Sequence, residues 1–165
     1  MKRLFKRRTI GIWILCAIWL TIIFYNGTRP GETSQRSSKE VVKVVSMFIN
    51  IPPPSIEKAS IKLSDVNFYV RKNAHFFQYL IFSVLLCAAV RQLKLYKSSE
   101  ILLVLFILLL IPVLDEFIQK YTSGRTSNVL DIVIDFSGGV LGLLISKVIV
   151  RKASRSRKNR KLFLE

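Results

Sequence analysis

The stretch that decides the fold is residues 129–150, "VLDIVIDFSGGVLGLLISKVIV". It is almost entirely apolar, and about twenty such residues suffice for a helix to cross the hydrocarbon core of a bilayer. Asp131, Asp135, Gly138 and Gly142 recur at spacings of three and four, so they share one helical face. The lower part of that face is a GxxxG pattern, which lets another helix approach closely. We therefore expect a membrane helix whose carboxylates face protein rather than lipid.

Three further apolar runs precede this one, at residues 9–25, 74–90 and 101–114. The chain of 165 residues carries 26 Lys and Arg and a net charge of +16, yet its mean hydropathy is +0.39. These values are compatible because the basic residues crowd the ends of the apolar runs. We predict an all-α fold: a polytopic membrane bundle of four transmembrane helices in a single domain, residues 1–165. A short amphipathic helix on the outer surface is expected at residues 41–49, followed by a proline-rich break.

Several alternative classes are disfavoured by where the residues lie. Cys16 and Cys87 both fall inside apolar runs, which favours small buried hydrophobes over a disulfide or a metal site. The first run lacks a small-x-small cleavage pattern at its end, so we expect a retained anchor rather than a cleaved signal peptide. The basic tail, residues 151–165, directly follows a span. Contact with anionic lipid therefore explains it better than nucleic-acid binding does.

The distribution of Lys and Arg predicts the orientation of the chain. Basic residues precede the first run, lie between the second and third, and follow the fourth. The positive-inside rule then places both termini in the cytoplasm and residues 26–73 and 115–128 outside. The basic residues of the long outer loop, residues 26–64, weigh little in this rule. The residues that carry the prediction are Lys2, Arg3, Lys6, Arg7, Arg8, Arg91, Lys94, Lys97, Arg151, Lys152, Arg155, Arg157, Lys158, Arg160 and Lys161.

This orientation brings distant polar residues to one level of the membrane. In "VRKNAHFFQYLIF", residues 70–82, Lys72, His75 and Tyr79 share a helical face at the outer end of the second helix. The outer end of the third helix and the loop after it add Asp115, Glu116, Gln119 and Arg125, beside Asp131 and Asp135 of the fourth. Ionisable groups at this depth pair with one another and mark functional sites. The apolar parts are short, which favours a polar pocket in the outer leaflet, with local bilayer thinning as the alternative.

These motifs resemble the VanZ-like family of membrane proteins over about residues 65–145. The resemblance rests on "VRKNAHFFQY", on "DEFIQKYTSGRTSNVLDIVIDFSGGVLG" and on their order. Position 135 is Asp where many relatives have Asn, so the family pattern does not require a charge there. The family takes its name from a determinant of resistance to glycopeptide antibiotics, notably teicoplanin. The resemblance therefore implies a bacterial cell membrane and a role in the envelope or the antibiotic response, but no particular reaction. The matching residues are Lys72, His75, Phe76, Tyr79, Asp115, Glu116, Gln119, Gly124, Arg125, Ser127, Asp131, Asp135, Gly138 and Gly142.

Two functions and one structural alternative follow. The favoured hypothesis is a binder of membrane lipid, a lipid-linked wall precursor or a lipoglycopeptide. The second is a membrane enzyme acting on such a precursor, with His75, Glu116 and Asp131 as acid–base candidates. No nucleophile elbow, metal motif or cofactor motif supports the enzyme, so we predict no metal and no cofactor. A purely structural ion-pair cluster is the third possibility. The predicted ligand-binding residues are Lys72, His75, Tyr79, Asp115, Glu116, Gln119, Arg125, Ser127, Asp131 and Asp135.

Overall fold

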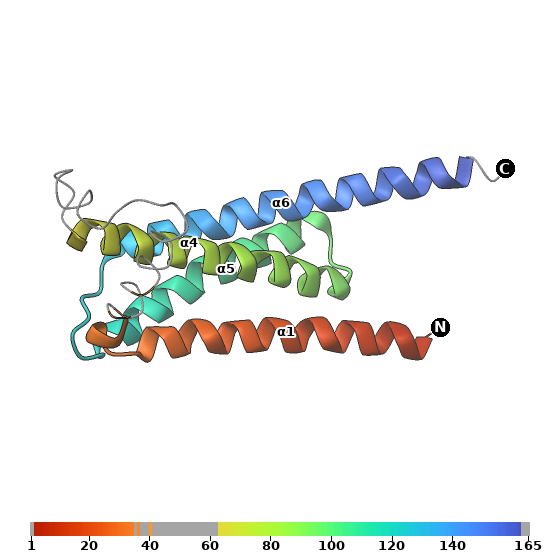
Figure 1. The fold of residues 1–165 in the computed structure, drawn as a ribbon. Coiled ribbons are helices and arrows are strands. Elements are labelled where there is room, and N and C mark those ends of the chain that lie inside the picture. The colour runs from red at the N-terminus through yellow and green to blue at the C-terminus, as the bar shows by residue number, and fades with distance from the viewer. Residues whose placement is uncertain (1, 35, 37–39, 41–62, 163–165) are drawn as a thin grey trace.

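The computed structural model describes residues 2–34, 36, 40 and 63–162. It contains the helices α1 (Lys2–Thr28), α4 (Leu63–Val90), α5 (Lys97–Lys120) and α6 (Val129–Leu162), with a short 3-10 helix, η1 (Arg91–Leu93), after α4 (Figure 1). The amphipathic helix predicted at residues 41–49, and most of the predicted outer loop, lie outside the described residues. Within the described part, every regular element is helical, which confirms the all-α fold class.

Among the residues that the structure describes, four helices are long and apolar enough to cross a membrane: Thr9–Thr28, Phe68–Leu93, Lys97–Lys120 and Val129–Ser156. The chain is therefore a multi-pass membrane protein. All four helices extend beyond the apolar runs seen in the sequence. The main-chain hydrogen bonds of a helix do not require apolar side chains, so a helix can continue into polar surroundings. The extended α4 carries Lys72 and His75 in the same rigid element as the apolar residues below them.

The helices α4 and α6 pack most closely, because glycine residues on α6 allow the two backbones to approach each other. A Cβ atom added at Gly138 would collide with the backbone of Phe76, and one added at Gly142 would collide with the backbone of Leu80. The GxxxG face of α6 thus packs directly on the α4 backbone, as the sequence predicts. Because this face also carries Asp131 and Asp135, the same packing turns both carboxylates toward α4.

The other helices close the bundle around this pair. Tyr79 and Phe82 of α4 lie in the core with Leu108 of α5, each at most 1% exposed. The indole nitrogen of Trp19 on α1 donates a hydrogen bond to the Gln78 carbonyl oxygen at 2.9 Å. This bond fixes α1 against α4 within the apolar part of the bundle.

The two ends of the bundle differ in chemistry. At one end, α1 and α5 finish and α4 and α6 begin (Figure 1). We call this the polar end, because the polar residues predicted to converge lie here. At the other end, α1 begins, η1 turns the chain into α5, and α6 extends past its neighbours. There, Arg91 pairs with Glu100 at 3.6 Å between the Nε and Oε1 atoms. The start of α1 and the end of α6 therefore lie on the same side.

Candidate functional site

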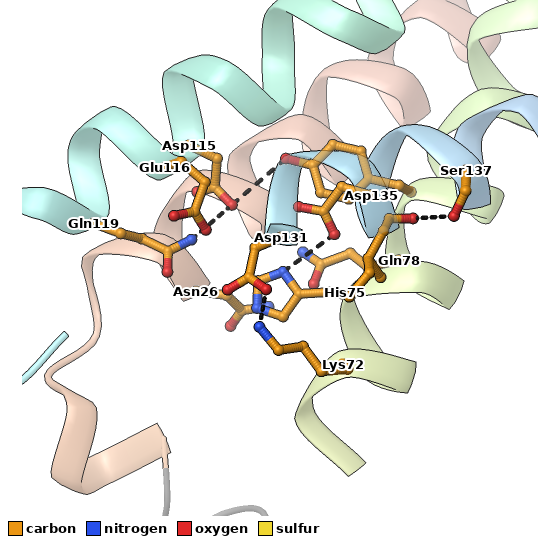
Figure 2. A network of polar contacts seen from close by, with 12 residues as sticks. Asn26, Lys72, His75, Gln78, Asp115, Glu116, Gln119, Asp131, Asp135 and Ser137 are labelled. Carbon is orange, nitrogen blue, oxygen red and sulfur yellow. Dashed lines mark hydrogen bonds and ion pairs between the residues drawn. The ribbon is translucent and has the colours of Figure 1, made fainter. Parts of the chain in front are cut away.

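Two contacts between a basic and an acidic side chain link α4 to α6 at the polar end (Figure 2). Lys72 Nζ contacts the Asp131 carboxylate, and both side chains are almost buried, at 13% and 12% exposed. His75 Nδ1 lies 3.5 Å from Asp135 Oδ1, and the Asp135 side chain is fully buried. The basic residues are three positions apart on α4, and the acidic ones are four apart on α6. The two pairs therefore lie about one helical turn apart along the contact between α4 and α6.

α5 places two further carboxylates beside these pairs. Asp115 Oδ2 accepts a hydrogen bond from Gln119 Nε2 at 3.1 Å and a longer one from the Tyr79 hydroxyl at 3.5 Å. Glu116 Oε2 accepts the backbone N–H of Asn128 at 2.8 Å. Glu116 is thus bonded to the loop before α6 rather than to a cation. Asp115 and Glu116 are at most 2% exposed.

Arg125 fastens the end of α1 to the α5–α6 loop. Its Nε donates to the Arg29 carbonyl oxygen at 2.9 Å, and Nη2 donates to the Asn26 carbonyl oxygen at 2.7 Å. Nη1 donates to Gln119 Oε1 at 2.8 Å, which joins this clamp to Asp115. Burial, and then the charge of Arg71, lower the pKa of the Arg125 guanidinium below its ordinary value. Three of its donors are engaged within the protein, so Arg125 acts first as a structural clamp.

Glycine permits the close approach of the chain around this clamp. The Gly31 N–H donates to the Ser123 carbonyl oxygen at 3.0 Å. A Cβ on Gly31 would collide with the Gly124 backbone, and Gly124 itself has a φ of 70°, which favours glycine. A Cβ on Gly27 would likewise meet the Asp115 carboxylate. The end of α1 is therefore part of the site's wall, although the sequence motifs do not include it.

Several buried oxygen atoms of the cluster have no hydrogen-bond partner among the described residues. They are both carboxylate oxygens of Asp135, Oδ1 of Asp115, Oε1 of Glu116 and Oδ1 of Asp131, the last of which is in the ion pair with Lys72. Buried polar atoms in proteins are almost always hydrogen-bonded, so each exception needs an explanation. The unpartnered oxygens give the cluster unused capacity to bind a cation, a proton or a hydrogen-bond donor.

Nine of the ten predicted ligand-binding residues lie at the polar end and make the contacts described above. Ser127 differs: it is exposed on the α5–α6 loop, and the described residues show no contact between it and the cluster. Two residues that the sequence did not single out also contribute, namely Asn26, through its backbone carbonyl oxygen, and Asn128, through its backbone N–H. The signal for Asn128 was present, because an Asn directly before an apolar run is a preferred helix cap; its Oδ1 accepts the Leu130 N–H at 3.0 Å.

Comparison with known proteins identifies the family. No curated protein and no solved structure matches this chain. The sequence does match the VanZ/LLP1 family over residues 12–150. This match extends beyond the motif-bearing residues 65–145 to include most of α1. The inclusion of α1 in the matched region is consistent with the structure, in which Arg125 and Gly31 join the end of α1 to the site. The match covers most of the chain, and the protein therefore belongs to the VanZ/LLP1 family.

Proposed function

We propose that this protein binds the polar head group of an amphiphilic envelope molecule at the polar end of the bundle, and so contributes to tolerance of teicoplanin-type glycopeptides. The ligand classes are a membrane lipid, a lipid-linked wall precursor and a lipoglycopeptide. Membership of the VanZ/LLP1 family is consistent with a role in teicoplanin resistance or in the envelope. Head-group binding is the finer part of the proposal, and it rests on the chemistry of the cluster.

The observation that carries the proposal is a graded exposure across the cluster. The Lys72 and His75 side chains remain 13% and 22% exposed, whereas Asp135 behind them is fully buried. Beside them, Phe68 exposes about half of its surface and packs edge-on against the exposed ring of Tyr69, and Lys72 Nζ lies 5.0 Å from the centre of the Phe68 ring. A charged edge next to exposed aromatic rings suits a molecule with a polar head and an apolar tail.

The proposed orientation places the polar end in the outer leaflet and both termini in the cytoplasm. It rests on the positive-inside rule, and the shared side of the two terminal helices is compatible with it. The test is labelling of single cysteines from outside intact cells, after Cys16 and Cys87 are replaced by Ser. Exposed Ser123→Cys, on the α5–α6 loop, should react, and exposed Lys94→Cys, at the opposite end, should not. Reaction at position 94 with protection at position 123 would reverse the orientation.

A membrane enzyme acting on the same class of molecule is the second candidate. The observation that favours it is the approach of His75 Nδ1 to buried Asp135, since a carboxylate beside an imidazole is a recurrent acid–base arrangement. The two candidates differ in their tolerance of His75→Gln, which keeps the size and hydrogen-bonding capacity but cannot transfer protons. A binder should retain most of its protective effect with this variant, whereas an enzyme should lose it.

The decisive experiment for the proposal is a teicoplanin dilution series in a sensitive host expressing the wild type or a variant. His75→Ala and Asp131→Asn should each remove protection, because the first removes a side chain at the accessible edge and the second removes the negative charge that pairs with Lys72. A matched control is truncation after Lys152, which removes charge at the far end of α6. Membrane abundance is measured for every variant. If the wild type protects and both edge variants protect equally at equal abundance, the proposal fails.

A further inference from the structure

The cluster gathers three potential metal ligands from three different helices, with half-buried His75 in front of the buried carboxylates of Asp115 and Asp135. A nitrogen of His75 on α4 and one carboxylate oxygen each from Asp115 on α5 and Asp135 on α6 all lie within 4.8 Å of one another. Two donors on a tetrahedral zinc ion are about 3.4 Å apart, since metal–ligand distances are about 2.0–2.2 Å. Small side-chain rotations would therefore bring all three donors onto one ion.

The second observation is the state of the donor atoms. Asp115 and Asp135 are at most 1% exposed. Oδ1 of Asp115 and both carboxylate oxygens of Asp135 have no hydrogen-bond partner among the described residues, and neither has His75 Nδ1. Figure 2 shows the Asp135 carboxylate directed toward His75 across the α4–α6 contact. These atoms are the ones that a bound cation would satisfy.

The charges point to the same conclusion. Asp115, Glu116, Asp131 and Asp135 give four negative charges, whereas Lys72 and Arg125, which contact members of the cluster, give two positive charges. With neutral His75 the cluster carries about two excess negative charges, an arrangement that is costly away from water. Arg71 is near, but no ion pair joins it to these carboxylates within the described residues. One divalent cation would balance the excess.

We propose that His75, Asp115 and Asp135 bind a divalent transition-metal ion, zinc or manganese, at the polar end of the bundle. An imidazole with two carboxylates favours such ions over magnesium or calcium, which prefer oxygen ligands alone. The Gln119 amide, which donates to the other oxygen of Asp115 and is itself held by Arg125, is the outer-shell group that orients this ligand. No metal motif is visible in the sequence because the three ligands come from separate helices.

The site goes beyond the proposed head-group function and does not depend on it. The ion would fix the inner carboxylates in place, while Lys72 and Asp131 stay at the accessible edge. The two proposals therefore differ in their response to Asp131→Asn. Head-group binding predicts that this variant loses teicoplanin protection, whereas the metal site predicts that it still binds the ion.

The test uses full-length protein purified in detergent, stripped with a chelator and then titrated with zinc or manganese. Bound metal is measured by elemental analysis after desalting, and the thermal midpoint is recorded with and without metal. We expect about one ion per chain for the wild type, a raised midpoint, and affinity at least about tenfold weaker for His75→Ala and Asp135→Ala. Asp131→Asn, the matched control, should bind metal like the wild type.

Two results would overturn the site. One is a wild type that binds no stoichiometric zinc or manganese, a result that stands even if the variants fail to fold. The other is loss of affinity that is equal in Asp131→Asn and Asp135→Ala, which would reflect general acidic charge rather than a defined ligand set. Cobalt substitution supplies a second measurement, because the visible spectrum of the bound cobalt should change when His75 is removed.

Discussion

Replacement of Arg125 by Ala tests whether the clamp between α1 and the α5–α6 loop stabilises the bundle. The guanidinium donates three hydrogen bonds of 2.7–2.9 Å, to two backbone carbonyl oxygens and to Gln119 Oε1. Arg125 is half-buried, so each bond contributes about 1 kcal/mol and the set about 3 kcal/mol. For a chain of this length, that loss corresponds to a fall in thermal midpoint of about 6–12 °C.

The assay is thermal unfolding of the purified protein in detergent, followed by intrinsic fluorescence or by loss of monodisperse protein. Arg125→Lys should recover about one third of the lost stability, because a single ammonium group cannot reach three diverging acceptors. Arg155→Ala is the control, since that exposed arginine lies on the far part of α6. If Arg125→Ala and Arg155→Ala unfold at the same temperature as the wild type, the clamp contributes nothing and our assignment of its role is wrong.

Two further predictions concern the α4–α6 contact. Lys72→Ala leaves Asp131 almost buried without its partner and should destabilise the protein by about 3 kcal/mol. The double variant Lys72→Ala with Asp131→Ala should recover much of this lost stability. Equal thermal midpoints for the single and double variants would contradict the pairing. Gly138→Leu should separate α4 from α6 and lower the thermal midpoint, because the Cβ atom of the new side chain would meet the backbone of α4 rather than a flexible side chain. Gly11→Leu is the control and should be tolerated, because nothing lies within 4 Å of a Cβ atom at that position. An unchanged midpoint for Gly138→Leu would show that the helices are not in close contact.

The sequence alone determined the four spans and the end of the bundle at which the polar residues lie. Apolar length is a local property of the chain, and helical periodicity assigns Lys72 and His75 to one face of α4 without any tertiary information. The GxxxG pattern likewise indicated which face of α6 is covered, and the structure places Asp131 and Asp135 on that buried face. Each of these inferences needs only the spacing of residues within one helix.

Only the tertiary structure decided which polar groups are partners. Periodicity does not fix the rotation of one helix against another, so the sequence did not distinguish Asp131 from Glu116 as the partner of Lys72. The packing of Gly138 on the α4 backbone sets that rotation, and Glu116 bonds the Asn128 N–H instead. The role of Arg125 was equally hidden, because two of its acceptors are the backbone carbonyl oxygens of Asn26 and Arg29. Every residue has such a carbonyl, so no side chain marks it in advance; only the path of the folded chain brings it within reach.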